Sequence, residues 1–160
     1  EGKVFEQGGL KVASLRVKHP PVTDCFALRF EHGERSVVFS SDTAFFPPLA
    51  DFARNADILV HEAMLEQGIE RLVAKTGNGV RLREHLLASH SFAGEAGRIA
   101  TDAGVLKLVL NHLIPADDPV IGEADWIAAA RKTWAGALTI ARDGLVVALG
   151  DEKLPGGKIA

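Results

Sequence analysis

Apolar and polar residues alternate over the first forty positions, as they do in half-buried strands. Gly9–Val17 alternates imperfectly, whereas residues 25–31 place apolar side chains at every second position. His32-Gly33 is typical of a tight turn into a further strand at residues 35–39. The pattern predicts an antiparallel hairpin in this part of the chain.

After residue 36 the pattern changes to short apolar runs separated by helical spacing, which predicts alternating strands and helices. The apolar runs at residues 36–40, 58–60 and 106–110 are typical of buried strands. Helices are predicted over residues 47–55, from Leu65 to the Gly77-Asn78-Gly79 loop, from an N-cap at Ser91 to Gly104, and over Glu123–Ala135. A closing hairpin is predicted from strands at residues 138–141 and 145–149.

Each of the three buried strands is followed by polar residues whose side chains could bind a metal or take part in catalysis. Asp42 follows the first strand, His61-Glu62 the second and Asn111-His112 the third. Strands of one sheet present such ends along a common edge, where rigid elements support functional loops. The sequence therefore predicts a site at this edge.

Asp42 has three possible interpretations. Its carboxylate could cap the turn that follows it, or it could bridge two metal ions. A phosphoacceptor role in a receiver domain is disfavoured, because the opening hairpin does not fit regular strand–helix alternation. Among the six histidines, His61 is expected either to orient its neighbours or to fill the core, and no role is assigned to His85. A single histidine is more often structural than a ligand, but several predicted beside Asp42 favour a metal site.

Several ordered segments together resemble the metallo-β-lactamase fold, in the branch of ribonuclease Z-like phosphodiesterases and arylsulfatase-type hydrolases. They are His19-Pro20-Pro21, Cys25–Phe30, Ser36–Thr43, Asp57–Ala63, Ser89-His90-Ser91 and Leu108–Pro115. The resemblance implies an α/β fold, an αββα sandwich of two similar halves. Residues 1–160 resemble its second half, a mixed sheet with flanking helices.

The same resemblance implies roles for individual residues. His19, Asp42 and His112 match metal ligands, with Asp42 as the bridging carboxylate between two divalent ions, zinc first and manganese second. Glu62 and His90 match residues that assist proton transfer near the scissile bond. The implied chemistry is attack on a phosphoester or sulfate ester by a water that two metal ions activate.

The chain also departs from that family's pattern. The ligand run His-x-His-x-Asp-His is absent and is expected before residue 1, on an upstream half or on another chain. Met64 and Phe92 replace threonines of the family's motifs, and Ser41 stands where glycine is usual. Only residues 20–41 separate His19 from Asp42, so the long insertion of some tRNA-processing members is missing. A small anionic ester is therefore the predicted substrate.

Composition limits the partners. A net charge of -3 gives no general attraction to nucleic acid or to anionic membranes. Nucleic acid is therefore not the expected partner, although a local basic patch could still bind it. No apolar run is long enough for a membrane span, and the single Cys25 excludes an internal disulfide. The chain opens within a strand-like pattern and without an initiator Met, which suggests a fragment or a processed product. A cytoplasmic location is expected, and an export signal upstream of residue 1 is the open alternative. A homodimer is one candidate assembly, and an inactive, metal-poor binding module is the alternative function.

Overall fold

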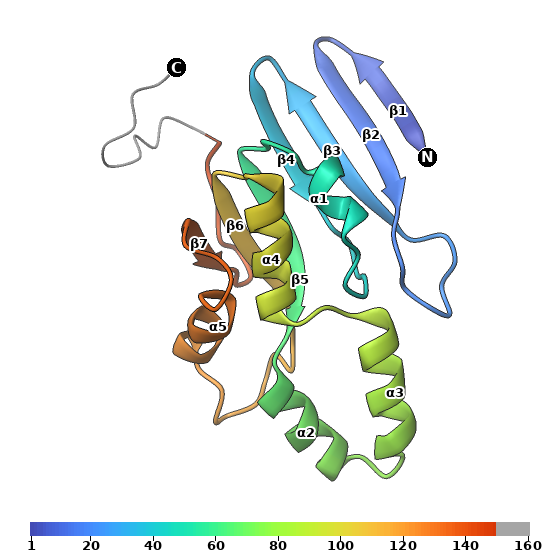
Figure 1. Ribbon diagram of the computed structural model, residues 1–160, viewed down its shortest axis with the longest axis vertical. Coiled ribbons are helices and arrows are strands. Elements are labelled where there is room, and N and C mark those ends of the chain that lie inside the picture. Colours follow the sequence, from blue (N-terminus) through green and yellow to red (C-terminus); the bar gives the residue numbers. More distant parts are fainter. Residues whose placement is uncertain (150–160) are drawn as a thin grey trace.

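The computed structural model describes residues 1–149, which form one seven-stranded mixed sheet (Figure 1). Its strands follow each other in chain order: β1 (Gly2–Gln7), β2 (Leu10–Arg16), β3 (Phe26–His32), β4 (Arg35–Phe39), β5 (Ile58–Met64), β6 (Lys107–Ile114) and β7 (Ala137–Ile140). Strands β1 to β4 pair antiparallel, and β4 to β7 pair parallel. The expected α/β class with a mixed sheet is confirmed.

Five helices accompany the sheet in the described residues. Three lie against one face: α1 (Pro48–Phe52), α4 (Ala93–Ala103) and α5 (Glu123–Ala130) (Figure 1). Helices α2 (Glu66–Lys75) and α3 (Gly79–Ser89) pack on each other beyond the carboxyl end of β5. No helix in residues 1–149 has the length and apolar character required to cross a bilayer.

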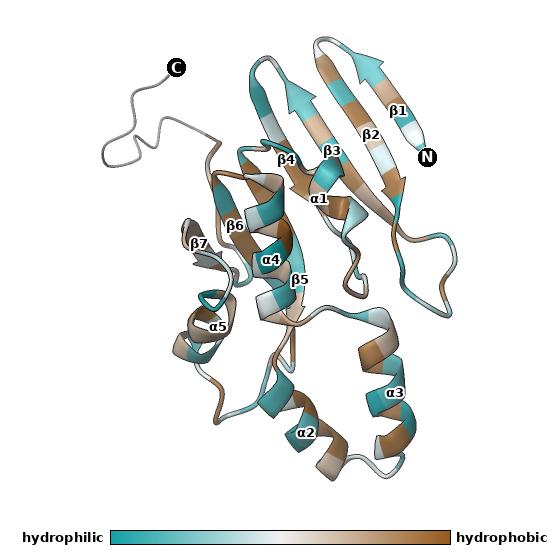
Figure 2. Cartoon of the chain, viewed as in Figure 1, coloured by the Kyte–Doolittle hydropathy of each residue, from teal (hydrophilic) through white to brown (hydrophobic). Residues whose placement is uncertain are grey.

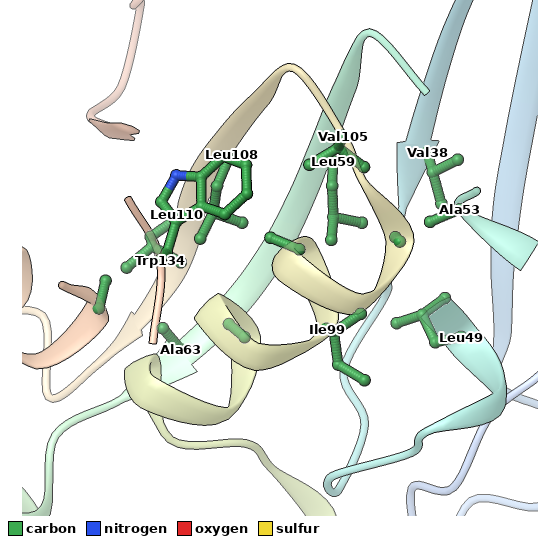
Figure 3. Close-up of a cluster of buried hydrophobic side chains, with 14 of the residues drawn as sticks. Val38, Leu49, Ala53, Leu59, Ala63, Ile99, Val105, Leu108, Leu110 and Trp134 are labelled. Carbon is green, nitrogen blue, oxygen red and sulfur yellow. The ribbon is translucent and has the colours of Figure 1, made fainter. Parts of the chain in front are cut away.

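The core lies between the sheet and the layer of α1, α4 and α5. Leu59 and Leu108 are fully buried on the strands, and Ile99 of α4 is 1% exposed. Figure 3 shows Ile99 of α4 near Leu49 of α1, in the same buried cluster as the strand residues Leu59 and Leu108. The outward side of α4 is mostly hydrophilic (Figure 2), so this helix is amphipathic and its apolar side holds the layers together.

The opposite face of the sheet is also partly apolar. Successive strand residues point to opposite faces, so Val38, which is fully buried in the core, is followed by Phe39, which is 42% exposed. Phe39 contacts Phe30 of β3 edge-to-face, with ring centres 5.9 Å apart. This face therefore carries aromatic surface away from the helices.

Two predicted strands are longer than their sequence pattern indicated. Strand β5 runs to Met64 and β6 to Ile114, so His61, Glu62 and His112 lie within strands and not after them. The reason is pairing: the polar ends of β5 and β6 are adjacent and continue the parallel ladder. A local reading of hydrophobicity does not detect such mutual support.

Two predicted helix boundaries are wrong. Helix α4 has its N-cap at Phe92, because buried Ser91 is engaged with other loops; Glu95 accepts the Phe92 N–H at 2.8 Å. The predicted end at Gly104 is confirmed by its left-handed conformation, φ +66°. Helix α5 ends at Ala130, five residues before the predicted boundary.

The prediction of a closing hairpin is also wrong. In addition, helix α3 was not predicted from the sequence. Residues 145–149 form no strand, because they make no ladder with β7, whose described pairing is with β6. Helix α3 begins at Gly79, inside the predicted loop. Leu82 and Leu86 pack it against the small cluster around Met64.

Candidate metal centre

The site lies at the carboxyl ends of β4, β5 and β6. His19 comes from the loop between β2 and β3, Asp42 from the turn after β4, and His90 from the junction of α3 and α4. One donor atom from each of these three residues lies within 4.8 Å of the others. His112 Nε2 is 3.4 Å from Asp42 Oδ2. The predicted histidines and carboxylate thus come together, although the three-donor group contains His90 and not His112.

The backbone before Asp42 is held in an unusual conformation. Ser41 has φ +53°, in the left-handed region that favours glycine, which accounts for the glycine usual at this position in the family it resembles. The Ser41 hydroxyl donates to the Phe26 carbonyl at 2.7 Å. Burial and, next, the charge of Asp42 raise the pKa of the Cys25 thiol, which donates to the Asp42 carbonyl oxygen at 3.3 Å. These contacts with Cys25 and Phe26, at the start of β3, fix the turn that directs the carboxylate.

His112 reaches the site through an irregularity in β6. Glu62 pairs with Asn111 and Ala63 with Leu113, so His112 is an extra residue on its strand. It has φ +40°, another left-handed value. A bulge bends its strand and redirects a side chain, often beside functional sites. Here the redirected side chain approaches Asp42.

His19 is oriented by a backbone carbonyl. Its Nδ1 lies 2.9 Å from the Ser89 carbonyl oxygen. A carbonyl only accepts, so Nδ1 carries a proton and donates; in the neutral ring Nε2 then keeps its lone pair. Metal-binding histidines are commonly fixed in this way by a hydrogen bond at the other ring nitrogen. His19 is therefore prepared to coordinate a cation through Nε2.

Glu62 is a buried carboxylate that joins two loops of the site. Its side chain accepts the Thr43 N–H at 3.1 Å and the Ser91 N–H at 2.9 Å, both at Oε1. Thr43 follows Asp42, and Ser91 follows His90. The Ser91 hydroxyl also donates to the Thr43 carbonyl at 2.6 Å. Glu62 therefore positions the segments that carry both neighbouring functional side chains.

His90 is close to Glu62 but makes no hydrogen bond with it. His90 Nδ1 and Glu62 Oε1 are 3.3 Å apart, yet His90 Nδ1 and Glu62 Oε2 are buried atoms without a hydrogen-bond partner among the described residues. The His90 ring centre lies 5.0 Å from that of His19 and 5.7 Å from that of His112. His90 is thus central in the cluster, with its orientation by Glu62 still a prediction.

His61 lies outside the cluster. On β5 it points to the same side as Leu59, into the helix-covered core, whereas Glu62 points to the other side. It is 1% exposed, and burial lowers its pKa. Its Nδ1 donates to the Glu62 carbonyl oxygen at 2.7 Å. Of the two expected roles, the structure supports that of a neutral core residue.

His85 is the residue that sequence reasoning missed. Its ring centre is 6.3 Å from that of His19 and 6.1 Å from that of His90. It lies on α3, one turn before Ser89, and that helix was not predicted. The spacing of His85 and Ser89, four residues apart, would have been the signal had the helix been recognised.

Several known proteins are similar to this chain in sequence or in structure. No protein-family model matches the chain. It is 29% identical over 142 residues to ribonuclease Z of Mycobacterium tuberculosis, covering 89% of this chain and 50% of that protein. It is 32% identical over 111 residues to ribonuclease Z of Halobacterium salinarum, covering 69% of this chain and 31% of that protein.

Among solved structures, the metallo-β-lactamase fold protein YhfI from Bacillus subtilis superposes with a TM-score of 0.65 and 28% identity. The match covers 88% of this chain and 50% of YhfI. The chain thus spans about half the length of the mycobacterial relative and of YhfI. These likenesses agree with the fold.

Proposed function

This chain is a ribonuclease Z-like protein of the metallo-β-lactamase fold, and from that premise we propose that it belongs to a metal-dependent phosphoester hydrolase. In this proposal residues 1–160 form the second half of the catalytic domain. They supply the bridging carboxylate Asp42 and the histidines His19 and His112. An upstream half or another chain supplies the remaining ligands.

The single observation that carries the proposal is the convergence of donors on Asp42. Its carboxylate is partly exposed and lies 3.4 Å from His112 Nε2, and His19 is fixed with its Nε2 lone pair free. Carboxylate oxygens and neutral imidazoles are the ligands that zinc takes in hydrolases. In this proposal the donors contribute to a site for two divalent ions, zinc first and manganese second, and their convergence favours a hydrolase over a metal-poor binding module.

When bound, a pair of divalent ions supplies a water activated near neutral pH and stabilises developing negative charge. The chain's own residues do the rest. Glu62 holds the Asp42 and His90 segments in register through its two accepted N–H groups. His90, between His19 and His112, protonates the leaving oxygen, a contribution of about 10²–10⁴-fold for general acids.

The proposal includes a substrate class and a surface for assembly. The similarity to ribonuclease Z supports a phosphodiester as the substrate class. A sulfate ester is the second candidate. The short segment between His19 and Asp42 favours a small anionic ester as the substrate. RNA is the alternative substrate. The aromatic sheet face around Phe30 and Phe39 offers apolar surface on which the upstream half or a second copy could pack.

The test is metal content and hydrolysis of the protein with its complete site. The unsubstituted protein is expected to hold about two zinc or manganese ions, by elemental analysis, and to hydrolyse bis(4-nitrophenyl) phosphate. Asp42→Ala should lose most of the metal and the activity, while the exposed-aspartate control Asp51→Ala keeps both. Full metal content in Asp42→Ala would contradict the proposal, and cleavage of 4-nitrophenyl sulfate alone would replace the phosphoester by a sulfate ester.

A further inference from the structure

The three donors that come within reach of a single ion are not the three ligands assigned above. One donor atom each from His19, Asp42 and His90 lies within 4.8 Å of the others, and His112 is not in that group. Three atoms with such separations share a point within about 2.8 Å of each, which is the 4.8 Å limit divided by √3. Zinc bonds to nitrogen and oxygen are about 2.0–2.2 Å long, so each donor needs to move by less than about 1 Å to bind one ion.

His90 carries a buried polar atom that its proton-donor role does not account for. Its side chain is 7% exposed, and its Nδ1 has no hydrogen-bond partner among the described residues. That atom lies 3.3 Å from Oε1 of Glu62, whose Oε2 is likewise buried without a partner. Buried polar atoms are seldom left unpaired, so this nitrogen and this carboxylate indicate a ligand that completes the pair.

A cation on the other ring nitrogen of His90 completes it. A metal-bound histidine commonly donates the N–H of its second nitrogen to a carboxylate or a carbonyl, which fixes the ring and makes it a better ligand. Glu62 stands at Nδ1 of His90, so Nε2 is the nitrogen that binds the ion. His19 is held in the same manner, because its Nδ1 donates to the Ser89 carbonyl oxygen.

The spacing of the two rings and the exposure of the carboxylate suit one four-coordinate ion. Two imidazoles on one tetrahedral ion have ring centres about 5 Å apart, given metal–nitrogen bonds of about 2.1 Å. The ring centres of His19 and His90 are 5.0 Å apart. The Asp42 side chain is 37% exposed, so water has access to the fourth position. Two histidines, one carboxylate and one water are a common donor set for zinc.

We propose that residues 1–160 by themselves hold one divalent metal ion through His19, Asp42 and His90, with His112 outside the coordination sphere. This site differs from the dinuclear centre described above, in which His112 is a ligand and His90 donates a proton. Nε2 of His90 cannot bind an ion and carry a proton at the same time. The one-ion state is therefore inactive, and His90 becomes a proton donor only when ligands of the upstream half take over the ion. This last consequence rests on the proposed function, whereas the one-ion site does not.

The test is metal binding to the whole chain after a chelator has removed any bound metal. Zinc is titrated calorimetrically, and cobalt is followed by the visible absorption of the four-coordinate ion, with one ion per chain expected. His90→Ala should weaken binding at least about a hundredfold, because even a residue that only orients a ligand contributes about 10–100-fold. His112→Ala should leave the affinity unchanged. His32→Ala, an exposed histidine before the β3–β4 turn, is the control for the number of histidines.

The outcomes separate this site from the hydrolase. Absence of binding, two ions per chain, or a loss of affinity in His112→Ala that equals or exceeds that in His90→Ala would overturn the one-ion site. Each of these results leaves the proposed function standing, because that function is tested on the protein with its complete site. Failure of the complete protein to hydrolyse a phosphoester would contradict the proposed function and leave the one-ion site standing.

A second measurement needs no substitution, so it decides the question even where a variant fails to fold. Long-range ¹H–¹⁵N spectra of the whole chain, with and without zinc, report on each ring nitrogen. On binding, Nε2 of His19 and of His90 should shift while their Nδ1 atoms carry protons, and the ring nitrogens of His61 and His112 should keep their positions. Zinc-dependent shifts confined to His19 and His112 would refute the assignment.

Discussion

Replacing Glu62 by alanine tests whether one buried carboxylate holds the site together. The Glu62 side chain is 2% exposed, and its Oε1 accepts two buried backbone N–H groups, from Thr43 and Ser91. Glu62→Ala leaves both donors without that acceptor. The two segments that carry Asp42 and His90 would then be joined chiefly by the hydrogen bond from the Ser91 hydroxyl to the Thr43 carbonyl.

The magnitude follows from the number of bonds lost. A buried donor left unsatisfied costs about 1–3 kcal/mol, so two cost about 2–6 kcal/mol of unfolding free energy. Removing the carboxylate also relieves the burial of Oε2, which has no hydrogen-bond partner in the described residues. That relief offsets part of the cost, so we expect a net loss of about 2–4 kcal/mol.

Glu62→Gln separates the hydrogen bonds from the charge. Its amide oxygen can still accept both N–H groups, so the expected loss is only about 1 kcal/mol, the difference between a charged and a neutral acceptor. The assay is urea unfolding of the whole chain at pH 7, followed by circular dichroism. Glu34→Ala, an exposed acidic residue in the β3–β4 turn, serves as the control and should unfold like the unsubstituted chain.

Two results would refute this reasoning. One is a Glu62→Ala variant within 0.5 kcal/mol of the unsubstituted chain, a threshold below the usual value of one net hydrogen bond, about 1 kcal/mol. The other is a Glu62→Gln variant as unstable as Glu62→Ala. The second outcome would assign the effect to the negative charge and not to the two accepted N–H groups.

Three further predictions concern the core and its pH dependence. Ile99→Ala empties a site that is 1% exposed and should cost about 2–5 kcal/mol in urea unfolding; a loss below 1 kcal/mol would mean that the helix layer collapses onto the gap. Burial lowers the pKa of His61 from its ordinary value of 6.5, so the unfolded chain takes up the proton first and stability falls as the pH drops below about 6.5. His61→Leu should flatten that part of the stability profile, and an unchanged profile would exclude His61 as its source. Gly68→Ala places a methyl group against the side chain of Pro115 and should cost about 1–3 kcal/mol, whereas at Gly77 the added group meets no atom within 4 Å and the thermal midpoint should stay constant.

Local patterns were sufficient for much of the sheet. The hairpin of β3 and β4 was predicted because alternation and a His32-Gly33 turn are properties of neighbouring residues. Helix α3 was not, because Gly79 stands at its first position and its apolar residues, Leu82 and Leu86, pack against the small cluster around Met64. Packing against that cluster adds to the helix propensity of the Leu, Arg and Glu residues of α3.

The sequence by itself determined that polar groups come at the ends of buried strands, and therefore that Asp42 and Glu62 lie near one edge of the sheet. Only the tertiary structure decided which imidazoles reach Asp42 and how each is oriented. His112 arrives through a bulge in the β5–β6 register, and His19 is oriented by the Ser89 carbonyl. Register and hydrogen-bond partners are set by segments far apart in the chain, so no local window of sequence contains them.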